Sequence, residues 1–161
     1  MNAGKYFNLS EISRRLNVSP TAVSKSLILL EKEGIVGVRE NGIMNLLSIE
    51  LSLENQKVLE FKRAENLLMI YESGLNYFLS ENLPGATIIL FGSYSRGDDL
   101  FNSDIDLAIV GIKGKRLDLS KFEKILGKKI ALNFYKNLSG IEKNLRDNLL
   151  NGIVLSGVIE L

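Results

Sequence analysis

The fold is decided by the stretch GSYSRGDDLFNSDIDLAIV, residues 92–110. It follows ATIILF, residues 86–91, a continuous run of apolar and β-branched residues that predicts a buried strand. Polar and apolar residues alternate from residue 103, which predicts a second strand over residues 103–110. A turn rich in small residues separates the two strands, so the pattern predicts a strand–turn–strand unit.

Two carboxylates stand two positions apart in the second of these strands. Asp104 and Asp106 therefore point to the same face of that strand. Carboxylates this close raise each other's pKa unless a cation neutralises them, and Asp98 and Asp99 add to the local negative charge. Mg²⁺ held by one or two carboxylates and by substrate phosphates is the usual solution. The spacing therefore favours a magnesium site.

The turn before these carboxylates suits a phosphate group. Gly92 lets the backbone approach a phosphate closely, and the exposed amides with the Ser93 hydroxyl can hold its oxygens. Arg96 either neutralises phosphate charge or is a solvated turn residue.

Together these residues resemble the Gly-Ser…Asp-x-Asp signature of the DNA polymerase β-like nucleotidyltransferase superfamily. The resemblance is closest to its minimal nucleotidyltransferases, many of them archaeal or bacterial. The ten residues between Ser93 and Asp104 match the usual spacing of this signature. The resemblance covers about residues 60–161.

This resemblance implies an activity and the residues that carry it. Gly92, Ser93 and Arg96 would bind the triphosphate of an incoming nucleotide. Asp104 and Asp106 would be the catalytic carboxylates and would hold Mg²⁺. An acceptor would attack the α-phosphate in line and release pyrophosphate. A nucleoside monophosphate would thus pass from an NTP to a nucleic-acid or protein acceptor.

The chain departs from the family pattern at a third carboxylate, which active members usually place on the next strand. That strand is expected over residues 129–135, where the candidate positions hold Ala131 and Asn133. Neither side chain can act as a base or as a charged ligand. Asp118 and Glu123 lie nearby in the sequence, but neither matches the motif position. The usual catalytic route is therefore in question, while nucleotide and metal binding are less affected.

The N-terminal residues predict two short helices. Ser10 precedes an amphipathic segment at residues 11–16. Ser19 is a candidate N-cap for a second helix with Pro20 at its first position, and Gly34 is its expected C-terminal stop.

A hairpin is expected next, around Asn41-Gly42, because this dipeptide is a strong hairpin signal. Helix, turn, helix and hairpin over residues 5–50 resemble a winged helix–turn–helix domain, whose second helix enters the DNA major groove. Carried over by this resemblance, the residues facing bases would be Thr21, Ser24 and Lys25, and those facing phosphates would be Arg14, Arg15 and Arg39.

The charge of residues 1–50 leaves two interpretations open. Six Lys or Arg against five Glu leave a net charge of only +1, a thin footprint for DNA binding. The first interpretation is a DNA-binding domain. The second is a winged-helix scaffold used for dimerisation or protein contact, since fold alone does not fix function.

A helical segment is expected over residues 55–82, either as one helix or as two broken near Gly74. Apolar residues recur in it at alternating spacings of three and four: Phe61, Ala64, Leu68, Tyr71, Leu75 and Phe78. This seam either packs on the following domain or forms a homodimer contact. One amphipathic face more often serves its own core, which favours the first interpretation.

The composition excludes several classes of chemistry. The chain of 161 residues has no Cys and no His, which removes disulfides, zinc–thiolate sites and His-based catalysis. No apolar run approaches the roughly 18–20 residues of a membrane span, and no secretory signal is recognised. A cytoplasmic location is the expectation.

The predicted fold class is α+β, with three parts: a winged helix–turn–helix domain at residues 1–50, a connecting helix at residues 51–84, and a small mixed-sheet nucleotidyltransferase-like domain at residues 85–161. The main functional hypothesis is a Mg²⁺-dependent nucleotidyltransferase with a DNA-binding winged helix. The alternative is a catalytically degenerate transcriptional regulator or antitoxin-type protein. The family resemblance adds a HEPN-type toxin as a candidate partner, and a homodimer is expected from the seam and from winged-helix practice.

Overall fold

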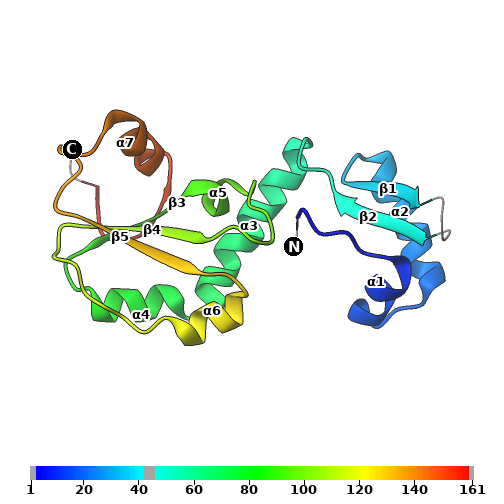
Figure 1. The fold of residues 1–161 in the computed structure, drawn as a ribbon, viewed down its shortest axis with the longest axis horizontal. Helices are drawn as coiled ribbons and strands as arrows, with labels where there is room; N and C mark the ends of the chain where they lie inside the picture. Colours follow the sequence, from blue (N-terminus) through cyan, green and yellow to red (C-terminus); the bar gives the residue numbers. More distant parts are fainter. Residues whose placement is uncertain (1–2, 42–45, 160–161) are drawn as a thin grey trace. The chain divides into compact units, whose positions relative to one another are not determined.

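The computed structural model describes residues 3–41 and 46–159. The chain divides into two compact units, residues 1–60 and residues 61–161. Each unit is described by itself below, with the elements drawn in Figure 1.

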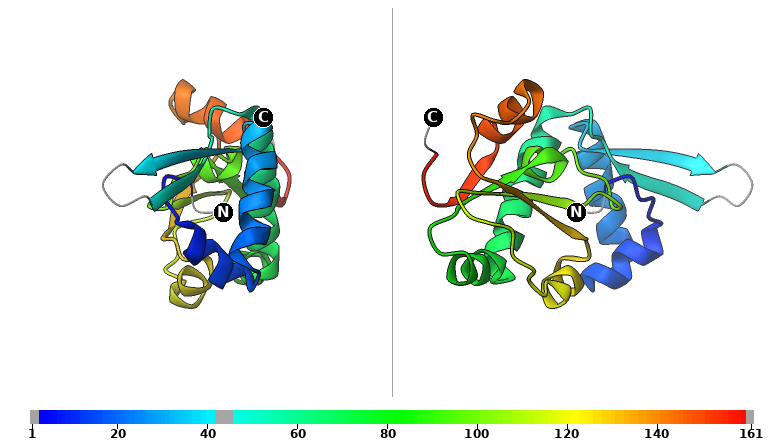
Figure 2. Two further views of the ribbon diagram at one scale, coloured as in Figure 1. Left: turned by 90° about the vertical axis from the view of Figure 1, so that its right-hand side faces the viewer. Right: turned by 60° about the vertical axis from the view of Figure 1, so that its left-hand side comes forward.

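The first unit contains two helices followed by a hairpin, in the order expected from the sequence. Its elements are α1 (Leu9–Leu16), α2 (Pro20–Lys32), β1 (Val36–Asn41) and β2 (Leu46–Leu51). The hairpin strands are antiparallel and pair from Val36 with Leu51 to Asn41 with Leu46 (Figure 2). Gly42 of the expected Asn41-Gly42 turn lies outside the described residues.

Capping residues explain where these helices begin and end. The Ser19 hydroxyl accepts a hydrogen bond from the Ala22 amide at 3.2 Å, and Gly34 follows the end of α2 with a φ of 68°, as predicted. The first helix begins earlier than expected. Asn8 rather than Ser10 precedes the first turn, because the Asn8 side chain accepts from the Glu11 amide at 2.8 Å.

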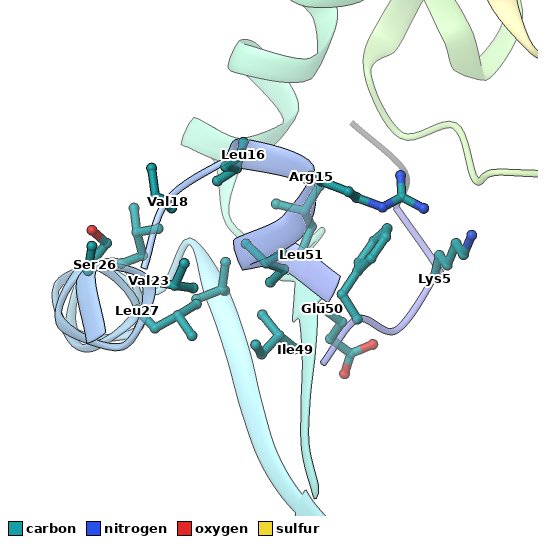
Figure 3. Close-up of a pocket in the computed structure, with 15 residues that line it drawn as sticks. Lys5, Arg15, Leu16, Val18, Val23, Ser26, Leu27, Ile49, Glu50 and Leu51 are labelled. Carbon is teal, nitrogen blue, oxygen red and sulfur yellow. The ribbon is translucent and has the colours of Figure 1, made fainter. Parts of the chain in front are cut away.

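The core of the first unit is small and partly open. Its buried residues are Val23 and Leu27 of α2 and Ile49 of β2. A largely apolar hollow of about 590 Å³ lies between α1, α2 and β2, with Arg15 and Lys5 at its edge (Figure 3).

The second unit is built on a four-stranded sheet in the order β5-β4-β3-β6. Its elements are α4 (Leu75–Asn82), β3 (Thr87–Phe91), α5 (Gly92–Arg96), β4 (Ile105–Val110), α6 (Ser120–Leu126), β5 (Ile130–Tyr135), α7 (Lys143–Leu150) and β6 (Ile153–Ser156). The sheet is mixed as predicted, since β4 and β5 are parallel while β3 is antiparallel to both of its neighbours. The α+β class is therefore confirmed.

The two faces of this sheet pack against different helices. Ile105, Leu107 and Ile109 of β4 lie in a core cluster with side chains of α4 and α6. Ala108 lies in a second cluster, with Leu149 of α7. Figure 1 shows α4 and α6 on one side of the sheet and α7 on the other. Because strand side chains alternate, Asp106 belongs to the α7 face.

The helix α3 (Gln56–Glu72) begins in the first unit and continues into the second. It stops before Gly74, whose φ of 76° is unfavourable for other residues, and α4 follows. Of the two alternatives for residues 55–82, the structure has two helices broken at this glycine.

The favoured interpretation of the helical seam is wrong for α3. Phe61, Leu68 and Tyr71 are about half exposed, at 54%, 53% and 47%. The helix instead turns Lys62, Asn66 and Ile70 inward, and all three are buried. The reason is that the Lys62 ammonium and the Asn66 amide donate hydrogen bonds to the buried Asp99 carboxylate. Only the α4 part of the seam, at Leu75 and Phe78, packs on the core.

Among the described residues, no helix is long and apolar enough to cross a lipid bilayer.

Candidate nucleotide and metal site

The candidate site begins where β3 ends. Buried Phe91 closes the strand, and Gly92 turns the chain directly into α5 with a φ of 72°. The sequence predicted a turn here, and the structure has a short helix instead. Ser93 lies in its first turn and is half-buried.

Strand pairing brings the turn and the carboxylates together. Phe91 pairs with Asp106 across β3 and β4, so Gly92 lies beside the Asp106 side chain. A Cβ atom added at Gly92 would lie 2.5 Å from Asp106 Oδ2. The glycine is therefore required twice, for its positive φ and for the space that the carboxylate occupies.

The environment of Asp106 favours a cation. Burial raises the pKa of Asp106, and the nearby negative charge of Asp104 raises it further. Asp104 is exposed and immediately precedes β4, while Asp106 is half-buried. A divalent ion would relieve the repulsion between the two carboxylates, so the donor set fits Mg²⁺.

Uncharged residues occupy the positions of β5 where active family members usually carry a third carboxylate. Ala131 of β5 pairs with Asp106, and Asn133 pairs with Ala108 one step farther along the strands. Ala131 is thus the position next to the two carboxylates. Within residues 3–41 and 46–159, no group of three or more acidic side chains is placed to hold a metal ion.

The two other nearby carboxylates have structural partners. Glu123 accepts hydrogen bonds from the Ile130 amide and the Lys129 ammonium, both at 3.1 Å. Asp118 accepts from the Ser120 amide at 3.0 Å at the start of α6. Neither replaces the third carboxylate, as the sequence motif indicated.

Arg96 lies at the end of α5 and remains half-exposed. Its Nε atom lies 3.3 Å from Asp98 Oδ2, and its guanidinium donates to Asn148 Oδ1 of α7 at 3.4 Å. These long contacts hold the guanidinium near the site without burying it. An incoming phosphate therefore meets little competition for this cation.

Asp99 does not add to the negative charge of the site, contrary to the expectation from the sequence. It is 1% exposed, and its carboxylate lies 2.6 Å from the Lys62 ammonium and 3.1 Å from the Lys128 ammonium. Asn66 donates to the same carboxylate at 2.8 Å and to the Tyr94 carbonyl at 2.9 Å. Burial alone would raise the pKa of Asp99, but hydrogen bonds from Lys62, Asn66 and Lys128 lower it overall.

Sequence reasoning missed this buried network. Lys62, Asn66 and Ile70 recur every four residues along α3, but a face that contains lysine ordinarily indicates solvent. The Lys128 ammonium is likewise turned inward, toward Asp99. No local sequence signal distinguishes a buried lysine from an exposed one. The partner of Lys62, for example, lies 37 residues away along the chain.

Comparison with known families decides the identity of this unit. The family model described as "Nucleotidyltransferase domain" matches residues 73–155, which include Gly92, Ser93 and both carboxylates. The chain belongs to this family. The match covers the sheet and the α5 turn, so the nucleotidyltransferase resemblance seen in the sequence is confirmed. No curated protein matches the chain.

Membership in the nucleotidyltransferase family suggests transfer of a nucleoside monophosphate in general terms. Domains of this family generally use Mg²⁺ and an NTP. In this chain, Asp104 and Asp106 are the groups that would hold such an ion.

The candidate DNA-binding residues lie in the other unit. Thr21, Ser24 and Lys25 are all exposed on α2, on the side away from buried Val23 and Leu27. Of the candidate phosphate contacts, Arg14 is exposed. Two others have partners: Arg15 pairs with Glu11 at 2.9 Å, and Arg39 pairs with Glu50 at 3.2 Å.

Proposed function

We propose that the protein is a Mg²⁺-dependent nucleotidyltransferase that transfers a nucleoside monophosphate from an NTP to a nucleic-acid or protein acceptor. The observation that carries this proposal is the close approach of Gly92 to the Asp106 carboxylate, which leaves no room for a Cβ atom. The start of α5, which we propose binds phosphate, therefore lies directly beside two carboxylates that repel each other.

The chemistry divides between the turn and the strand. The backbone at Gly92, the Ser93 hydroxyl and the Arg96 guanidinium bind and orient the triphosphate. Asp104 and Asp106 hold Mg²⁺, which supplies charge neutralisation for the phosphates when bound. The oxygen of an acceptor hydroxyl forms a bond to the α-phosphorus and gives up its proton to solvent. The bond from the α-phosphorus to the oxygen that bridges it to the β-phosphorus breaks, and pyrophosphate leaves.

Calorimetric titration of ATP, GTP, CTP and UTP, each with and without Mg²⁺, tests the proposal without knowledge of the acceptor. We expect Mg²⁺-dependent binding that is lost in the double variant Asp104→Asn/Asp106→Asn, because amides cannot replace charged ligands. If the wild-type protein binds none of the four nucleotides, the proposed function is wrong.

Two glycine variants sharpen the same experiment. Gly92→Ala introduces a Cβ against Asp106 and should weaken the Mg²⁺-dependent binding. Gly74→Ala is the matched control, because its φ of 76° is close to the 72° of Gly92 but nothing lies within 4 Å of the added Cβ. Both variants carry about 1–2 kcal/mol of backbone strain. Only Gly92→Ala should weaken nucleotide binding.

A second function is favoured by the exposed face of α2. We infer that the first unit is a winged helix whose residues Thr21, Ser24 and Lys25 face DNA bases. The corresponding biological role is regulation of the protein's own operon. Binding to DNA from the upstream region should weaken steeply with salt. If the protein does not bind this DNA, or if binding does not depend on salt, the DNA-binding role is wrong and a role of this unit in protein contact is favoured.

Two partner proteins remain proposals. A HEPN-type toxin is proposed as the protein acceptor or bound partner, by analogy with minimal nucleotidyltransferases. A homodimer through α3 is supported by Phe61, Leu68 and Tyr71, an apolar row that is about half exposed and lies outside the core clusters of the described residues.

A further inference from the structure

We propose that Lys128 is a positioning residue for the magnesium–nucleotide site, acting on the backbone of the loop that leads into Asp104. The loop at residues 97–104 joins α5 to β4 and so carries the first carboxylate of the proposed site. The effect of Lys128 on nucleotide binding rests on the proposed function. The contacts of Lys128 with the loop do not depend on that function.

The contacts of Lys128 converge on this loop. Its ammonium donates to the Leu100 carbonyl and, at 3.2 Å, to the Ser103 carbonyl, the residue directly before Asp104. The same ammonium lies 3.1 Å from Asp99 Oδ2, and its side chain is only 10% exposed. The Lys128 ammonium therefore joins Asp99 and Leu100 to Ser103 across the loop. Within the loop, the Leu100 amide donates to the Ser103 hydroxyl at 2.9 Å and the Ser103 amide donates to the Leu100 carbonyl at 3.0 Å.

Lys128 is the second cation on Asp99. Lys62 is fully buried and already pairs with Asp99, with contacts of 2.6 Å to its carboxylate and 2.7 Å to its carbonyl. Bringing a second ammonium out of water onto the same carboxylate carries a desolvation cost. The cost is offset by the hydrogen bonds of Lys128 to backbone carbonyls, so its role is to hold the loop.

The placement of Lys128 links the loop to two other parts of the site. It lies three residues before Ala131, the partner of Asp106 in β5. Its ammonium also lies 5.8 Å from the centre of the Tyr94 ring in α5. The lysine thus holds the Asp104 loop between the phosphate-binding turn and the strand beside the carboxylates.

The test compares Lys128→Met with Lys129→Met, in the full chain. Methionine keeps the apolar stem and removes the charge. Lys129 is the matched control, because it is the adjacent lysine, is 77% exposed and pairs with Glu123 outside the loop. Lys62 remains paired with Asp99 in both variants, which preserves the buried ion pair and the fold.

Hydrogen exchange of the metal-free protein gives the first readout. Lys128→Met should speed exchange of the amides in residues 100–104 while the amides of β3 keep their rates, because only the loop is released. Lys129→Met should leave both regions unchanged. Wild-type exchange rates in the loop of Lys128→Met would overturn the proposal.

Nucleotide affinity gives the second readout. Lys128→Met should lose about 10–100-fold of the Mg²⁺-dependent affinity, as for other residues that orient metal ligands, and Lys128→Arg should restore part of it. Affinity without Mg²⁺ should not change. A loss of the Mg²⁺-free affinity would instead make Lys128 a phosphate ligand and overturn the positioning role. If wild type binds no nucleotide, the proposed function fails, and the exchange result alone decides whether Lys128 holds the loop.

Discussion

Replacing Asp99 with alanine is expected to lower the free energy of unfolding by about 3–5 kcal/mol, because two buried ammonium groups lose their carboxylate. Lys62 is fully buried and the Lys128 side chain is 10% exposed, so water cannot readily solvate the charges left behind. Urea unfolding followed by circular dichroism measures the change. If Asp99→Ala does not fold, the same measurement is made on Asp99→Asn, because asparagine keeps the shape of the side chain and one acceptor oxygen.

The neighbouring carboxylate provides the control for this prediction. Asp98→Ala removes a half-exposed pair with Arg96 and should change the unfolding free energy by no more than about 1 kcal/mol. Equal effects of the two alanine variants would contradict the assignment of Asp99 as the buried centre of the network.

The same comparison should depend on pH in a defined direction. The pKa of Asp99 is lowered in the folded protein, below its ordinary value of about 3.8. Its stabilising contribution is therefore complete above that value and is lost as the pH falls through the folded pKa. The groups facing it are the Lys62 and Lys128 ammonium groups, the Asn66 amide and Tyr94. The stability gap between wild type and Asp99→Asn should narrow only below about pH 4.

The second large effect is expected from Ala131→Asp, which supplies the carboxylate that the family pattern has and this chain lacks. Ala131 pairs with Asp106, so the new side chain joins the two existing carboxylates on one face of the sheet. A third charged ligand should tighten Mg²⁺ binding by about tenfold or more. Without metal, the added repulsion should lower the melting temperature. Thermal unfolding at increasing Mg²⁺ concentration measures both effects.

Asn133→Asp is the matched control for this gain. It adds the same charge to the same strand, but Asn133 pairs with Ala108 rather than Asp106. Its Mg²⁺ response should therefore stay close to that of wild type. A similar Mg²⁺ response in the two variants would show that added charge alone, and not the position beside Asp106, stabilises the metal-bound protein.

Much of the second unit could be predicted from local pattern. The apolar run before Gly92 and the alternation after Ser103 predicted β3 and β4, because strand burial leaves a period of two in the sequence. In the first unit, Ser19 and Gly34 predicted where α2 begins and ends, because the ends of a helix need local hydrogen-bond partners.

The sheet class, the Gly-Ser pair at the end of β3 and the two carboxylates could be predicted because these features depend on neighbours along the chain. The buried face of α3 and the buried ion pairs of Asp99 depend on the three-dimensional fold. Apolar spacing predicted Phe61 and Leu68 inside, but Lys62 is inside because its ammonium meets a carboxylate 37 residues away. Burial of a charge depends on a partner brought by the fold, and no periodicity in the sequence records that distance.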